Sequence, residues 1–80
     1  MRIKRAAIKL SEDGLVIEGK RHNECIRKAV DMGRKTPIDC EQGFVTDADI
    51  FVSRVDAAKI AYESGQTAEN VKVLYLEDIL

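Results

Sequence analysis

The chain contains no tryptophan, one proline and one histidine among its 80 residues, and aromatic residues make up only 5% of it. It is also short, and a domain near this size buries only about 60% of the surface that its unfolded chain exposes. We therefore expect one domain over residues 1–80, with added stability coming from association between copies. The hydrophobic share of 45% is too high for a disordered chain.

Long apolar runs are absent as well. No window approaches the roughly 18 consecutive apolar residues of a membrane span, and no hydrophobic run follows the first five residues. We expect no membrane anchor and no secretory signal, hence a cytoplasmic protein, located in the host cytoplasm if a phage encodes it. Cys25 and Cys40 lack the short spacings of a zinc site, so two reduced thiols and no metal are expected.

Neither sign of charge is in clear excess, because 13 basic and 14 acidic residues give a net charge of −1 and a pI of about 5.8. The two halves differ, however: residues 1–40 carry ten basic and six acidic residues, and residues 41–80 carry three and eight. This division indicates an anion site in the basic half, or contact between oppositely charged faces of copies, although two solvated faces give the same pattern. Nucleic acid is not expected as a partner, since a pI above about 9 is usual for proteins that bind it.

Two strands and a turn are predicted at the start of the chain. Ala6, Ile8 and Leu10 alternate with other residues, which is the period of a half-buried strand. Residues 15–18 form a second run, and Asp13-Gly14 between the two suits a tight hairpin turn. The first eighteen residues are therefore interpreted as a β-hairpin.

Helical periodicity follows the hairpin. The spacing of residues 22, 26, 29, 30 and 33 predicts a helix over about 21–32 that ends at Gly33. Residues 34–42 are expected to form a loop, 43–46 a third strand and 47–49 a turn. Ser53 and Asp56 have the spacing of a capping box, which predicts a second helix over about 54–64, before Gly65.

A last strand is predicted over 71–76, so the expected element order is ββαβαβ. The fold class is therefore α+β, with a small antiparallel or mixed sheet of about four strands and two helices on one face. Catalytic motifs are missing: the histidine has no nucleophile at a diagnostic spacing, and neither a Walker loop nor a GxGxxG motif occurs. We interpret the chain as a binding protein that is not an enzyme and needs no cofactor.

Cations stand at the two predicted helix starts. Lys20, Arg21 and His22 lie where a strand leads into a helix, and free N–H groups with the positive end of a helix dipole suit phosphate binding. The structural alternative is a solubilising connection with His22 at the edge of the core. Arg54 lies on the first turn of the second helix, where a cation needs an anion or a carboxylate as partner.

One aromatic residue has a candidate ligand role. Phe44 follows Gly43, where a missing side chain leaves a ring face open to stack on a base, and a core position fits the sequence equally well. Phe51, beside the second helix start, and Tyr62, on that helix's apolar stripe, are expected in the core.

Three segments resemble small phage proteins, among them the first Thoeris anti-defence family: GKRH (19–22), GFVTDADIFVSRVDAAKIAYESGQ (43–66) and LYLEDIL (74–80). Members of that family are sponges that sequester cyclic ADP-ribose isomers made by bacterial TIR proteins, and some bind cyclic oligonucleotides. The resemblance implies an α+β protomer, a homo-oligomer that is a dimer or larger, such as a hexamer, nucleotide sites between subunits, and no catalysis. It is incomplete at residues 47–50, where a glycine and a basic residue are expected.

The resemblance also implies which residues contact the ligand. Lys20, Arg21 and His22 would bind phosphate, and Phe44 would stack on a base. The remaining polar contacts would come from Ser53, Arg54, Asp56 and Gln66. Another function class stays open, because the charge division also fits a small inhibitor module that binds a host protein through its acidic C-terminal face.

Overall fold

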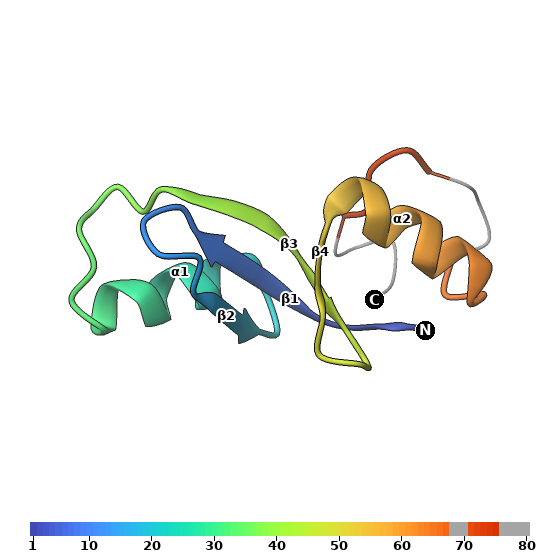
Figure 1. Cartoon of the computed structure of the whole chain (residues 1–80), viewed down its shortest axis with the longest axis horizontal. Helices are drawn as coiled ribbons and strands as arrows, with labels where there is room; N and C mark the ends of the chain where they lie inside the picture. Colours follow the sequence, from blue (N-terminus) through green and yellow to red (C-terminus); the bar gives the residue numbers. More distant parts are fainter. Residues whose placement is uncertain (68–70, 76–80) are drawn as a thin grey trace.

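The computed structural model describes residues 1–67 and 71–75 (Figure 1). The elements in chain order are β1 (Ile3–Leu10), β2 (Val16–Gly19), α1 (His22–Asp31), β3 (Cys40–Thr46), β4 (Phe51–Ser53) and α2 (Arg54–Glu63). They form one sheet in the order β2-β1-β3-β4, in which every neighbouring pair is antiparallel. The predicted α+β class, with four strands and two helices, is confirmed.

The N-terminal hairpin forms where the sequence predicts it. Gly14 adopts a left-handed φ of 76°, and the N–H of Leu15 donates to the Asp13 carboxylate at 3.1 Å, so both turn residues act as expected. The two helices also end near the predicted glycines, since Gly33 and Gly65 have φ values of 85° and 81°.

Both helices pack on the same face of the sheet but over opposite ends of it. The side chains of Ala6, Ile8 and Leu10 point to that face from the central strand β1. The cluster under α1 contains Ile8, Leu10, Ile17, Cys25 and Ala29. The cluster under α2 contains Ile3, Ala6, Phe44, Ala57, Ala58, Ala61 and Leu74.

The result is a long molecule with extents of 39 × 20 × 18 Å. In Figure 1 the two helices run in opposite directions away from its middle. Tyr62, predicted in the core, is instead 46% exposed, because three alanines at 57, 58 and 61 form the buried face of α2.

The last predicted strand is wrong over the described part of its range. Residues 71–75 form no strand; instead, Leu74 is fully buried in the cluster under α2, and its N–H donates to the carbonyl of Arg54 at 2.9 Å. Residue 76 lies outside the described residues. The fourth strand is Phe51–Ser53, because the turn after Thr46 returns the chain alongside β3 before α2 begins.

Candidate anion-binding site between the helix starts

Both helices begin beside the same stretch of β3, residues 42–44. α2 starts directly after Ser53, which pairs with Gly43 in the β3–β4 ladder. At the start of α1, Nε2 of His22 donates to the carbonyl of Gly43 at 2.7 Å, and the imidazole meets the Phe44 ring edge-on at 5.3 Å. The positive ends of both helix dipoles therefore lie near the middle of the sheet.

The first turn of α1 has no side-chain cap. Its first main-chain hydrogen bonds run from the N–H groups of Glu24 and Cys25 to the carbonyl of Arg21. Among the residues described, no side chain accepts from the N–H groups of His22 and Asn23. The exposed side chains of Lys20 and Arg21 likewise form no ion pair there. This helix start therefore offers free donors and two free cations. 

Arg54 is held at the start of α2 by two contacts. Its Nη2 donates to Oε1 of Gln42 at 2.8 Å, and its guanidinium carbon lies 5.3 Å from the centre of the Tyr75 ring. Its Nε is buried and has no partner in the structure as described. A buried cationic donor without an acceptor is costly, so this group is suited to receive an anion.

Gln42 and Tyr75 were not predicted as part of the site. Gln42 stands two residues before Phe44, so strand alternation places both side chains on the helix-covered face. A third strand predicted from Cys40, where β3 begins, would have revealed this relation. No signal in the sequence places Tyr75 beside Arg54.

The stacking role implied for Phe44 is wrong for this protomer. Its ring is fully buried, so neither face is open to a base. Successive residues of a strand point to opposite faces, and the space left by Gly43 therefore lies on the far side of the sheet. Phe51 fills that space: a Cβ built on Gly43 would lie 2.7 Å from its Cζ. Phe51 is half-buried on the helix-free face, which also corrects its predicted core position.

Gln66 and Ser53 have structural partners that occupy their polar groups. Gln66 accepts from the N–H of Ile3 at 2.7 Å and donates to the carbonyl of Ile3 at 2.9 Å, so both ends of its amide already have partners within the chain. The hydroxyl of Ser53 accepts from the N–H of Asp56 at 3.2 Å, which confirms the Ser53 half of the predicted capping box; the described structure has no reciprocal bond to the Asp56 carboxylate. The Asp56 side chain is exposed on the first turn of α2. The structure thus groups His22 and Arg54 around β3, with Lys20 and Arg21 next to His22.

Both cysteines are free, as predicted. Burial raises the pKa of the Cys25 thiol and that of Cys40 above the usual value, so neither is activated as a nucleophile. Across residues 1–67 and 71–75, no three His, Cys, Asp or Glu side chains are grouped so that they could hold a metal ion.

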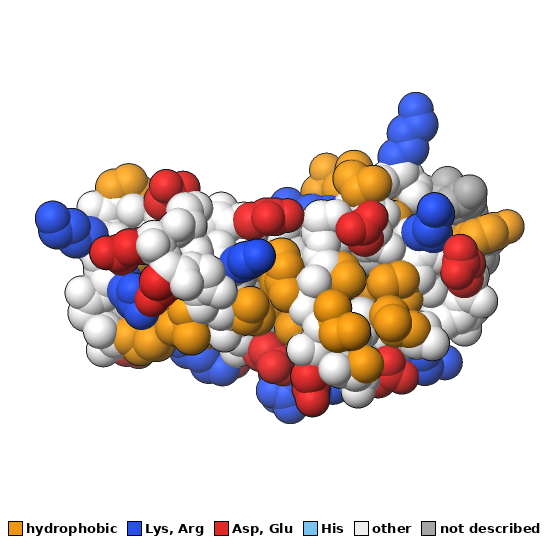
Figure 2. All heavy atoms as spheres, viewed as in Figure 1, with side chains coloured by type: hydrophobic (Ala, Val, Ile, Leu, Met, Phe, Trp, Pro, Cys, Tyr) orange, Lys and Arg blue, Asp and Glu red, His pale blue; other side chains and the backbone are white. Residues whose placement is uncertain are grey.

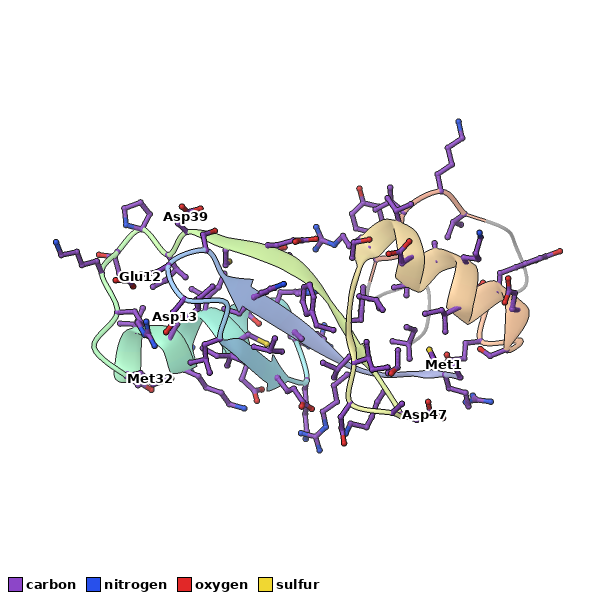
Figure 3. The ribbon with its side chains drawn as sticks, in the orientation of Figure 1. Met1, Glu12, Asp13, Met32, Asp39 and Asp47 are labelled. Atoms are coloured by element: carbon purple, nitrogen blue, oxygen red, sulfur yellow. The ribbon has the colours of Figure 1, made fainter. Side chains whose placement is uncertain are left out.

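On the one face that Figure 2 shows, the charges do not divide as they do along the sequence. Acidic and basic side chains are interspersed on it from end to end. Some are paired: Arg34 donates to Glu12 at 3.3 Å and to Asp13 at 3.0 Å, which joins the loop after α1 to the β1–β2 turn. In Figure 3 these two acids lie at the end of the molecule where Met32 ends α1.

The fold and the site together define a small α+β protein with basic groups gathered at two helix starts. A family model described as phage T4 y16D protein matches residues 2–80, and the chain therefore belongs to this family. The predicted likeness to small phage proteins is confirmed at that level. No curated protein and no solved structure matches the chain. Within the described part of the chain, no helix has the length and apolar character needed to cross a membrane.

Proposed function

We propose that this phage protein binds and sequesters a cyclic nucleotide signal, either a cyclic ADP-ribose isomer or a cyclic oligonucleotide, without cleaving it. The observation that supports this function is the meeting of two helix starts at residues 42–44 of β3. Each start provides the positive end of a dipole, and Lys20, Arg21 and Arg54 add cations beside them.

The two helix starts offer different donors. At α1, the free N–H groups of His22 and Asn23 suit a phosphate oxygen, with Lys20 and Arg21 available for the remaining charge. At α2, Ser53 already caps the helix, so the anion would be received by the Arg54 guanidinium. Two separate cationic points suit a ligand that carries two or more phosphates, as cyclic oligonucleotides and cyclic ADP-ribose do.

A homo-oligomer, a dimer or larger, belongs to the same proposal. One short chain with helices at opposite ends of a sheet covers only one side of a nucleotide, whereas ligand sites usually bury most of their ligand. A second copy supplies the other wall.

Equilibrium dialysis tests the function directly. The purified protein is dialysed against cyclic ADP-ribose isomers and cyclic di- and trinucleotides, then heated, and the released ligand is identified by mass spectrometry. We expect depletion of one of these ligands and its recovery intact. Absence of depletion for all of them would refute sequestration, and recovery as a new compound would make the protein an enzyme.

Variants at the helix starts test the site. We expect the double change Lys20→Ala and Arg21→Ala, and separately Arg54→Gln, to weaken binding roughly tenfold or more, since charge-assisted hydrogen bonds are lost. Lys59→Ala is the matched control, because Lys59 is an exposed cation further along α2. An equal loss with Lys59→Ala would indicate non-specific attraction by net charge.

A second candidate function is inhibition of a host protein, and one surface feature favours it. An open hollow of about 620 Å³ lies between α2 and residues 71–73; its apolar lining includes Val55 and Tyr62, which are 60% and 46% exposed. Glu63 lies beside it. If this surface binds a host protein, we expect Glu63→Lys to abolish inhibition of that protein and Arg54→Ala to leave the inhibition intact. The reverse result would support the nucleotide site.

A further inference from the structure

The chain has four phenylalanine and tyrosine rings, all in its described part, and one of them is both exposed and close to the candidate site. Phe44 is fully buried, and Phe51 lies on the helix-free face of the sheet. Tyr62 is exposed but lies at the hollow further along α2. Tyr75 is 49% exposed and lies beside Arg54, at the start of α2. Tyr75 is therefore the ring that a ligand at this helix start can reach.

The main chain at Tyr75 is held in place by the residue before it. Leu74 is fully buried in the cluster under α2, and its N–H donates to the carbonyl of Arg54 at 2.9 Å. In Figure 1 the segment 71–75, coloured red, passes beside the first turn of α2. An exposed ring on an anchored main chain loses little conformational freedom when a ligand binds to it, which favours binding.

The Arg54 guanidinium lies over the Tyr75 ring and is itself held by Gln42. Its carbon is 5.3 Å from the centre of the ring, and its Nη2 donates to Oε1 of Gln42 at 2.8 Å. A cation over one face of an aromatic ring is a favourable contact, and it fixes the position of the ring. Aromatic rings in this kind of setting stack on nucleic-acid bases, because every base has a flat π-face.

We propose that Tyr75 stacks on the base of the bound nucleotide with the side of its ring that faces away from Arg54, while Arg54 receives a phosphate of the same ligand. In a nucleotide one ribose joins the base to the phosphate, so the two groups can contact neighbouring side chains. This inference rests on the proposed function. It gives Tyr75 the stacking role that the sequence predicts for Phe44, and it makes Tyr75 the residue that distinguishes a nucleotide from other phosphate compounds.

Two ligands that differ in the base test the inference. AMP and ribose 5-phosphate share a phosphorylated ribose, so the ratio of their dissociation constants, measured by calorimetry, isolates the contribution of the base. We expect AMP to bind the wild-type protein roughly tenfold more tightly or better, and Tyr75→Leu to remove most of this difference. Tyr75→Phe keeps the ring and should retain the difference. If AMP binds the wild type no better than ribose 5-phosphate, or if neither binds, the inference is overturned.

Two further variants separate stacking from a purely structural role of the ring. Arg54→Gln should weaken AMP and ribose 5-phosphate by a similar factor, because both ligands carry the phosphate. Tyr62→Leu removes the other exposed tyrosine and should change neither dissociation constant. If Tyr75→Leu weakens both ligands equally, the ring serves to support Arg54, and stacking is refuted.

Ring-current shifts provide a measurement that needs no change at Tyr75. The chain has no tryptophan and two tyrosines, so Tyr62→Phe leaves Tyr75 as the single tyrosine in the proton NMR spectrum. A base stacked on this ring should shift its proton resonances upfield when AMP is added, whereas ribose 5-phosphate should not. Tyr75 resonances that stay in place while AMP is bound would contradict stacking.

The stacking role and the sequestration of a signal can fail separately. If a cyclic nucleotide is depleted in dialysis and Tyr75→Leu binds it as tightly as the wild type does, sequestration stands and the stacking role is wrong. If no cyclic nucleotide is depleted but AMP binds more tightly than ribose 5-phosphate through Tyr75, the stacking role stands and sequestration of these signals is wrong.

Discussion

Gly43 controls the spacing between β3 and β4. A Cβ at this position would lie 2.2 Å from the carbonyl oxygen of Val52 and 2.7 Å from Cζ of Phe51. The first of these atoms belongs to the backbone and cannot rotate away. The glycine is therefore required by the close approach of two strands.

We expect Gly43→Ala to lower the free energy of unfolding by about 3 kcal/mol, near the upper end of overpacking effects. Gly19→Ala is the comparison, because its Cβ would lie 3.1 Å from the Cys25 sulfur, which is the tightest contact, and 3.4 Å or more from its other neighbours. That change should cost about 1 kcal/mol or less. Urea denaturation of both variants measures the difference, and equal losses would show that the strand spacing is not limiting.

Gln66 joins the end of α2 to the N-terminal strand through both main-chain groups of Ile3. Gln66→Ala leaves an N–H and a carbonyl without partners, so a loss of about 1–3 kcal/mol in unfolding free energy is expected. Nucleotide binding should remain unchanged at temperatures where the variant is folded. A loss of binding in the folded variant would restore Gln66 to the ligand site.

The aromatic residues show which features of the site can be predicted from the sequence and which cannot. The sequence predicts a gap beside Gly43, and it places that gap next to Phe44, the neighbour along the chain. In a strand the residue that fills such a gap comes from a neighbouring strand, here Phe51. Finding it requires the β3–β4 register, which local patterns do not specify.

Among the elements, the connection from α1 to β3 is joined to the β1–β2 turn by the Arg34 side chain and by a main-chain hydrogen bond from the Ser11 N–H to the Asp39 carbonyl at 3.0 Å. Arg34 binds Glu12 and Asp13 in the β1–β2 turn. The N–H of Leu15 and then Arg34 lower the pKa of Asp13 below its usual 3.8. The pKa of Asp13 is lower in the folded state than in the unfolded state. The ionised carboxylate therefore stabilises the fold at pH values above the unfolded pKa, and this stabilisation is lost as the pH falls through the folded pKa.

Asp13→Asn should therefore reduce stability at neutral pH and have progressively less effect below about pH 4. Urea midpoints measured from neutral to acidic pH, for the variant and the wild type, test this. Glu63→Gln serves as the control, since Glu63 is exposed on α2 and forms no ion pair in the described structure. A constant difference between Asp13→Asn and wild type down to pH 2 would contradict the assigned cause.

The elements whose ends carry turn or capping residues could be predicted from the sequence. Asp13-Gly14 marked the hairpin, Gly33 and Gly65 marked the helix ends, and Ser53 marked the start of α2. The segment after residue 70 has the alternation of a strand but not its structure, because Leu74 is drawn into the cluster under α2. Local alternation identifies an apolar segment, and tertiary packing decides how it is used.

Across the whole molecule, two clusters lie over one sheet, and β1 takes part in both. Leu74 belongs to the cluster under α2 and Ile17 to the one under α1. Leu74→Ala should cost about 2–5 kcal/mol and reduce hydrogen-exchange protection mainly in α2. Ile17→Ala should reduce it mainly in α1. Equal loss in both helices for either variant would mean that the two ends unfold as one unit.

The opposed directions of the helices have an electrostatic consequence for the molecule as a whole. Two helices of ten residues each point their positive ends at the centre and their negative ends at the tips. Their dipole moments largely cancel, and what is left is quadrupolar: positive at the waist and negative at both extremities. Such a field does little to orient the molecule toward a distant charge. It still attracts a nearby anion to the centre of the molecule, whichever end the anion approaches from.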